Sequence, residues 1–378
     1  MSLIIAGIYI HIPFCKQSCY YCNFHFSTSL KNKNAFIESI LQEIELRKDE
    51  LGSDKVNTIY FGGGTPTVLE IKEINRIINS VFKNFKTIEN PEITIEANPD
   101  DLNESNLKYL SENFNRISIG VQSFYDKELK LMNRLHSSNQ AKKSIELSKK
   151  YFYNISIDLI YGIPGLSDEK WMKNIEKVKE YNLPHVSAYA LTVEPKTTLK
   201  KLIEQGKIDN IDDRVLKRQN KIIATELGKS NYLNYELSSF AQKGYMSINN
   251  SAYWKRKNYI GLGPSAHSFN GKQRMWNINN NIKYIKSLKK NTLPITIENL
   301  TNIDIYNEIV MTGLRTMWGI SLDEIENNLG KDFKDYLLNK SRIKIQNNLI
   351  TLDNNYLKIT KKGRFLSDGI ASDLFMLN

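Results

Sequence analysis

Roughly the first 240 residues repeat one pattern: a short β-branched or aromatic run, a polar or glycine residue at its end, and then an amphipathic helical stretch. Strands that alternate with helices in this way predict a parallel sheet with helices packed against it. Six such units predict a partial (β/α)6 barrel, with a doubly wound sheet as the alternative. The six runs are GIYIHI (7–12), VNTIYF (56–61), EITIEA (92–97), RISIGVQ (116–122), NISIDLIYG (154–162) and HVSAYALT (185–192).

Polar or glycine residues stand where four consecutive runs end. They are the segment 62–65 (GGGT), Glu96, Gln122 and Asp158. Because the carboxyl ends of barrel strands meet at one rim, these residues are expected at the mouth of a single site. Any one of them can simply mark the end of a strand, but the four together favour a binding site.

The C-terminal part has a different pattern. From about Asn302, helical stretches alternate with the run LITLDNNYLKIT (349–360), which divides into two strands around residues 353–355. Helices with one hairpin predict a small α+β domain of the winged-helix type. The expected domains are therefore a barrel over 1–240, a connecting segment over 241–300 and the winged-helix-like domain over 301–378.

The composition narrows the possible environments and partners. The 378 residues carry a net charge of +11, but the lysines are scattered, which is typical of a solvated surface and does not favour nucleic acid. No apolar run approaches the ~18 residues that would cross a bilayer. The N-terminus has no basic stretch, so it is expected to be a strand and not a signal peptide. Three cysteines without an export signal indicate a reducing cytoplasm.

All three cysteines lie within eight positions, as Cys15, Cys19 and Cys22. Soft thiolate ligands suit zinc or an iron–sulfur cluster. His25, three residues further on, could complete a Cys3His zinc site. A [4Fe–4S] cluster usually takes four cysteines, so three would leave one iron open to a small molecule. The spacing by itself leaves both interpretations open.

Seven further motifs favour the cluster through a resemblance to a known family. They resemble, in order along the chain, the oxygen-independent coproporphyrinogen III oxidase family of radical S-adenosylmethionine (SAM) proteins, which includes the HemW-type heme chaperones. The motifs are YIHIPFC (9–15), FGGGTPT (61–67), IEANPD (95–100), GVQSF (120–124), NRLH (133–136), IDLIYGIPG (157–165) and GLGPSAHSF (261–269).

This resemblance implies two cofactors. The three cysteines would bind three irons of a [4Fe–4S] cluster, and SAM would bind the fourth iron. The glycines after the second strand would let backbone amides approach SAM, and Arg134 could pair with a carboxylate in bidentate fashion. The SAM contacts implied by the family are Tyr9, Tyr21, Gly62, Gly63, Gly64, Thr65, Glu96, Gln122, Arg134, Asp158, Ala190 and His267.

Two features favour the heme-chaperone branch. The oxidases have a fourth cysteine two positions after the third, where this chain has Phe24, and they have an extension before the first strand, whereas this sequence begins only eight residues ahead of Tyr9. The branch also has a His-Asn-x-x-Tyr-Trp motif linked to heme. Here it reads NNSAYW, so the heme residues would be Asn249, Asn250, Tyr253 and Trp254.

Asn249 therefore replaces the histidine of the motif. Asparagine is a poor iron ligand, and Tyr253 or His267 could serve instead. Alternatively, Tyr253 and Trp254 could be an aromatic pair that packs the barrel against the C-terminal domain.

The resemblance implies a [4Fe–4S]- and SAM-binding protein that transfers heme to respiratory or heme-storage proteins, without nucleic acid, and with a dimer left open. The alternatives are oxidative decarboxylation of coproporphyrinogen III, or a zinc-binding nucleic-acid module.

Overall fold

The computed structural model of the chain describes residues 5–377. Its central element is one curved sheet, in the order β12-β11-β10-β9-β1-β2-β3-β4-β5-β6-β8-β7. The six predicted runs form six neighbouring parallel strands, which confirms the partial (β/α)6 barrel. They are β1 (Ile5–Ile12), β2 (Lys55–Gly63), β3 (Thr87–Ala97), β4 (Arg116–Gln122), β5 (Asn154–Tyr161) and β6 (His185–Ala190).

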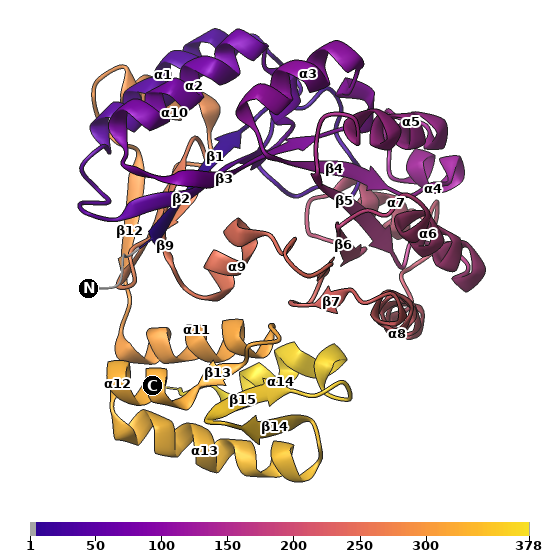
Figure 1. Cartoon of the computed structure of the whole chain (residues 1–378), viewed down its shortest axis with the longest axis vertical. Coiled ribbons are helices and arrows are strands. Elements are labelled where there is room, and N and C mark those ends of the chain that lie inside the picture. The colour runs from indigo at the N-terminus through magenta and orange to yellow at the C-terminus, as the bar shows by residue number, and fades with distance from the viewer. Residues whose placement is uncertain (1–4, 378) are drawn as a thin grey trace.

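Helices cover the outer face of this sheet, and Figure 1 shows them along its convex side. The helices of the barrel are α1 (Lys33–Leu46), α2 (Ile71–Asn84), α3 (Glu104–Asn113), α4 (Asp126–Leu131), α5 (Ser138–Ser148), α6 (Asp168–Glu180), α7 (Thr198–Glu204) and α8 (Asp213–Lys229). The short 3-10 turns η1 (Pro66–Val68) and η2 (Pro99–Asp101) follow the carboxyl ends of β2 and β3.

Alternation along the strands separates an apolar outer face from a polar inner face. On β1, Ile8, Ile10 and Ile12 are fully buried in the main hydrophobic core together with Phe36 and Ile40 of α1. The residues between them on β1 face the lumen. A polar lumen differs from the packed apolar interior of a closed barrel, and it leaves space for a ligand.

The segment after β6 completes the sheet at both edges. β9 (Asn258–Leu262) pairs in parallel with β1, and β8 (Ser239–Ala241) pairs antiparallel with β6. α9 (Ile248–Trp254) lies on the concave side of the sheet in Figure 1. The remaining elements here are β7 (Leu233–Asn234), β10 (His267–Phe269), β11 (Gln273–Asn277), α10 (Asn281–Leu288) and β12 (Ile295–Asn299).

A second hydrophobic core, around Tyr306 and Leu357, belongs to the C-terminal domain. Its three-stranded antiparallel sheet has the order β13-β15-β14 and contains the predicted hairpin. The elements are α11 (Asn302–Leu314), β13 (Ile320–Ser321), α12 (Leu322–Leu329), α13 (Lys331–Gln346), β14 (Ile350–Asp353), β15 (Tyr356–Ile359), the turn η3 (Arg364–Leu366) and α14 (Ser367–Leu374).

Candidate functional site

A cavity of about 580 Å³ opens at the carboxyl ends of the barrel strands. The loop after β1, the glycines after β2 and the ends of β3 to β6 all contribute to it. Most of the residues expected at the SAM and cluster site line this one cavity: Cys15, Cys19, Tyr21, Cys22, Gly63, Gly64, Thr65, Glu96, Gln122, Arg134, Asp158 and Ala190.

Backbone hydrogen bonds hold the cysteine loop in place. The Cys15 amide donates to the Ser27 carbonyl (3.1 Å), and the Ser27 amide donates to the Pro13 carbonyl (2.9 Å). The Tyr20 amide donates to the carbonyl of Met132, next to the NRLH motif (3.1 Å). The loop is thus closed at its base and anchored to the far side of the cavity mouth.

The thiols lie among groups that donate hydrogen bonds to sulfur. Thr65 Oγ1 donates to Cys15 Sγ (3.6 Å), and Arg134 Nη1 donates to Cys19 Sγ (3.4 Å). Burial raises the pKa of Cys15 to about 11 and also raises the pKa of Cys22. Thiolates here therefore need a positively charged partner, and iron supplies one. The donor set fits a cluster bound by three cysteines.

The glycines after β2 allow the two loops to lie in direct contact. A Cβ on Gly64 would lie 2.5 Å from the Phe14 carbonyl oxygen, and Gly63 has φ +103°. The Gly64 amide donates to the Ile12 carbonyl (2.8 Å), and the Thr65 amide to the Phe14 carbonyl (2.7 Å). Both amides are occupied within the protein, which for Gly64 differs from the expectation that the glycine amides approach SAM. The glycines instead provide close approach to the cysteine loop.

Two carboxyl groups line the deeper part of the cavity. Tyr60 donates a hydrogen bond to Glu96 Oε1 (2.8 Å). Burial, followed by the charge of Asp158, raises the pKa of Glu96 to about 7. Burial raises the pKa of Asp158 to about 6, although the Arg116 guanidinium opposes this shift. A cationic ligand would favour the ionised carboxylates, so the pair suits the positive charge of SAM.

Arg134 has a different set of partners from the one expected. Its Nη2 donates to Asn98 Oδ1 (2.6 Å) and to the Gly120 carbonyl (2.8 Å), while Nη1 contacts Cys19. The guanidinium is therefore held at the thiols and does not stand free for a bidentate carboxylate. The sequence analysis missed Asn98, which also bonds Thr65 Oγ1 (3.0 Å) and so links two parts of the cavity. The position of Asn98 directly after β3, at the carboxyl end of a strand, is the sequence signal that could have identified it.

Three of the predicted contacts lie outside the cavity lining. Tyr9 stacks on Tyr60, with ring centroids 6.0 Å apart, deeper in the lumen. Gly62 lies behind Glu96, since a Cβ there would be 3.1 Å from the Glu96 carboxyl carbon. His267 is exposed beside Trp276.

His25 does not join the cysteines. Its Nε2 donates to Asn281 Oδ1 (2.6 Å), and its carbonyl accepts from His11 Nε2 (2.8 Å). Within residues 5–377, no three His, Cys, Asp or Glu side chains are assembled for a single metal ion. The His25 ring is thus hydrogen-bonded to Asn281, the first residue of α10, which argues against a Cys3His zinc site.

At a deeper level of the lumen, three neighbouring strands present polar atoms without partners. Thr94, Arg116 and Asn154 are register partners on β3, β4 and β5. Among the described residues, Thr94 Oγ1, Arg116 Nε and Asn154 Oδ1 have no hydrogen-bond partner, and Arg116 is only 2% exposed. Buried polar atoms are normally satisfied, so this level is suited to water or a polar ligand group.

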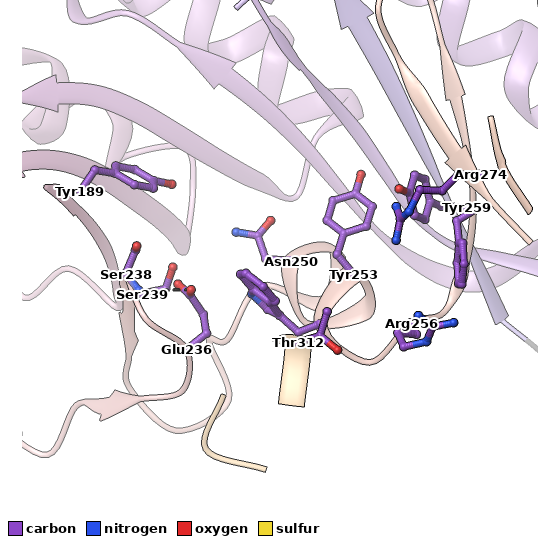
Figure 2. A pocket seen from close by; sticks show the side chains of 12 residues that line it. Tyr189, Glu236, Ser238, Ser239, Asn250, Tyr253, Arg256, Tyr259, Arg274 and Thr312 are labelled. Atoms are coloured by element: carbon purple, nitrogen blue, oxygen red, sulfur yellow. Dashed lines mark hydrogen bonds between the residues drawn. The ribbon is translucent and has the colours of Figure 1, made fainter. Parts of the chain in front are cut away.

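The predicted heme residues lie around α9, where they separate into two groups. Asn249 is buried, its Oδ1 accepts from Thr58 Oγ1 (3.1 Å), and its amide donates to Glu92 (3.0 Å). Asn250, Tyr253 and Trp254 instead line a cleft of about 340 Å³. Figure 2 shows Tyr253 and Asn250 projecting into it opposite Tyr189. Asn249 is therefore not placed with the other three in this cleft.

The cleft adjoins two other hollows. It shares Tyr189 and Ser238 with the cysteine cavity. It also shares Trp254, Arg256 and Thr312 with a cleft of about 640 Å³ against the C-terminal domain. A ligand beside α9 would thus lie between the cysteine cavity and the second domain.

Comparison with known proteins gives this site its context. Residues 9–178 match the Radical SAM superfamily, and residues 300–366 match the HemN C-terminal domain. The chain is 32% identical over 365 residues to the heme chaperone HemW of Lactococcus lactis, which covers 96% of this chain and 95% of that protein. The chain belongs to the HemW family of radical SAM proteins. The heme chaperone HemW of Bacillus subtilis is 30% identical over 374 residues, with 97% and 98% covered.

The fold of the HemW family member described here is also that of a solved relative. Coproporphyrinogen III oxidase (HemN) from Escherichia coli aligns with a TM-score of 0.83 at 24% identity, over 99% of this chain and 91% of that one. Membership of the radical SAM superfamily implies a [4Fe–4S] cluster and SAM. Across residues 5–377, no helix is both long and apolar enough to span a membrane.

Proposed function

We propose that this protein is a heme chaperone, which binds heme in the cleft beside α9 and passes it to acceptor proteins. The observation that carries the proposal is the aromatic cleft holding Asn250, Tyr253 and Trp254, which shares Tyr189 with the cysteine cavity. The naming of its relatives from Lactococcus lactis and Bacillus subtilis as heme chaperones supports it. Acceptors of respiratory or heme-storage function are the partners that the resemblance implies.

The proposal includes the cofactor sites. Cys15, Cys19 and Cys22 would hold the cluster, and the rest of the cavity would hold SAM. The remaining SAM contacts are those that line the cavity at the strand ends, with Glu96 and Asp158 facing its positive charge. Tyr9 and Gly62 would lie behind these contacts, and the exposed His267 would not contact SAM.

Tyr253 is the iron ligand that we propose in place of the motif histidine. It lines the cleft, whereas Asn249 is bonded to Thr58 and His267 lines neither cavity. Tyrosine is an established axial ligand of heme iron. Burial, and then Tyr259, raises the pKa of Tyr253, so binding through the phenolate should strengthen as the pH rises.

Phe24 favours the chaperone over the oxidase. It lines the cysteine cavity and is 69% exposed, at the position where the oxidases have a fourth cysteine. A phenylalanine cannot bind a metal or carry a proton, so whatever that cysteine contributes is missing here.

The test begins with the full-length chain purified without oxygen. About four irons and four sulfides per chain are expected, and heme titration should give a saturable Soret shift that Tyr253→Phe displaces in position and weakens. Addition of coproporphyrinogen III, SAM and a reductant should give no protoporphyrinogen IX. Turnover of that substrate would assign the oxidase function instead, and one zinc without sulfide would overturn both readings.

A further inference from the structure

Two arginines at the cleft beside α9 share a single carboxylate. Arg274 on β11 donates through Nη2 and Nε to Glu308 Oε1 (2.6 and 2.7 Å). Arg256, just after α9, pairs with Oε2 of the same Glu308 on α11. Their side chains are only 31% and 10% exposed. Glu308 therefore joins the C-terminal domain to the barrel through both guanidiniums.

The charges in this cluster do not cancel. Two guanidiniums face one carboxylate, which leaves one positive charge in a partly buried place. Glu236 also lines the cleft, but its carboxylate accepts from the Ser238 amide (3.1 Å). Glu324 lies in the adjoining cleft, and neither residue forms an ion pair with these arginines among the described residues. A partly buried surplus charge is costly and favours an anionic ligand.

The arginines stand against aromatic walls. The guanidinium carbons of Arg256 and Arg274 lie 4.9 and 5.2 Å from the centroid of the Phe269 ring. Tyr259 lies next to Phe269. The Tyr253 ring packs edge to face on the Tyr259 ring, with the two ring centroids 4.6 Å apart. Figure 2 shows both arginines at the end of the cleft where Tyr259 lies. A flat apolar wall beside surplus positive charge suits a planar aromatic ring that carries carboxylates.

We propose that Arg256 and Arg274 bind a propionate carboxylate of the porphyrin, whose ring lies along the aromatic wall. This inference rests on the proposed heme-binding function and identifies the part of the ligand that the site recognises. The propionate supplies the negative charge that Glu308 alone does not. The adjoining cleft of about 640 Å³, which shares Trp254, Arg256 and Thr312 with this one, is where the rest of the macrocycle would lie.

The test compares heme with its dimethyl ester, which has the same ring and iron but no ionised propionates. Arg274→Gln removes the surplus charge and keeps the Arg256–Glu308 pair, so the domains should stay joined. We expect Arg274→Gln to weaken heme binding about tenfold to a hundredfold, the range of a lost charged hydrogen bond, and to leave ester binding within about twofold. Arg76→Gln, which removes an outer-surface arginine paired with Glu38, should change neither.

Iron-free protoporphyrin separates this site from the iron ligand. Arg274→Gln should weaken protoporphyrin binding, whereas Tyr253→Phe should not. Equal weakening of heme and ester by Arg274→Gln, or no effect on either, would overturn the propionate assignment while heme binding itself stands. A wild-type chain that binds neither porphyrin would overturn the proposed function and this inference together.

Discussion

Thr58 Oγ1 donates a 3.1 Å hydrogen bond to Asn249 Oδ1, and this contact holds the side chain of Asn249 against β2. The residue that stands in for the motif histidine is thus only 3% exposed and is packed near Gly7, where a Cβ would be 3.6 Å from Asn249 Oδ1. The neighbouring Asn250 lines the cleft instead. Two adjacent residues of α9 therefore face different surroundings: Asn249 packs on the sheet, and Asn250 faces the cleft.

Restoring the histidine should consequently not restore a heme ligand. In Asn249→His, the larger ring has to fit between Thr58 and Gly7, so the free energy of unfolding should fall by about 1–3 kcal/mol. Heme affinity should not rise. Thermal unfolding and heme titration measure the two effects.

Asn250→His is the matched variant, because it places the same ring in the cleft. It should keep the stability of the wild type and shift the Soret band towards that of a histidine-bound heme. If Asn249→His instead binds heme more tightly without loss of stability, the packing described for Asn249 is wrong.

The cluster should depend on the cysteines and not on His25. Cys22→Ala should lose most of the iron and sulfide, since one of three thiolate ligands is removed. His25→Ala should retain about four irons per chain, because the His25 ring bonds Asn281 and not the metal site. Iron and sulfide analysis after anaerobic reconstitution compares the two, and equal loss of iron and sulfide would show that the cluster needs His25.

Glu96 should make the stability of the SAM-free chain depend on pH. Its pKa rises from 4.5 to about 7 on folding, so the folded form binds the proton more tightly. Its contribution to stability is complete below about pH 4.5 and is lost as the pH rises through 7. Asp158 acts in the same direction between 3.8 and about 6.

Glu96→Gln should therefore flatten the fall in melting temperature between pH 5 and pH 8. Glu112→Gln, which removes an exposed carboxylate from α3, is the control and should leave the slope as it is in the wild type. An unchanged slope in Glu96→Gln would show that this carboxyl does not titrate in that range.

Gly64→Ala should damage the site through sterics alone. Its Cβ would lie 2.5 Å from the Phe14 carbonyl oxygen and 2.8 Å from that of Ile12, so the two loops must separate. We expect a loss of about 2 kcal/mol or more in stability, together with reduced iron content. Urea unfolding and iron analysis measure these effects.

Gly228→Ala tests the same substitution where nothing lies within 4 Å. Gly228 is an exposed residue of α8, so alanine should stabilise the chain by about 0.5–1 kcal/mol and leave the iron unchanged. Similar losses in both variants would contradict the steric argument.

Much of the fold could be predicted because its signals are local. Six β-branched runs with helical stretches between them specify parallel strands, and each of the six became one. The strand ends carrying Glu96, Gln122 and Asp158 followed from the same geometry, since parallel strands bring their carboxyl ends to one rim. The cysteine spacing likewise lies within a single loop.

Short-range periodicity and spacing thus specify the strand–helix order, the cysteine loop and the rim that faces it. The packing of the folded chain was needed to show that Asn249 packs on Thr58, that His25 bonds Asn281, and that the Gly64 amide is already occupied. It also brought Arg256 and Arg274 to one Glu308. All of these partners lie tens to hundreds of residues apart in the sequence. Their pairing depends on how helices and domains pack, which no local pattern of hydrophobicity or charge records.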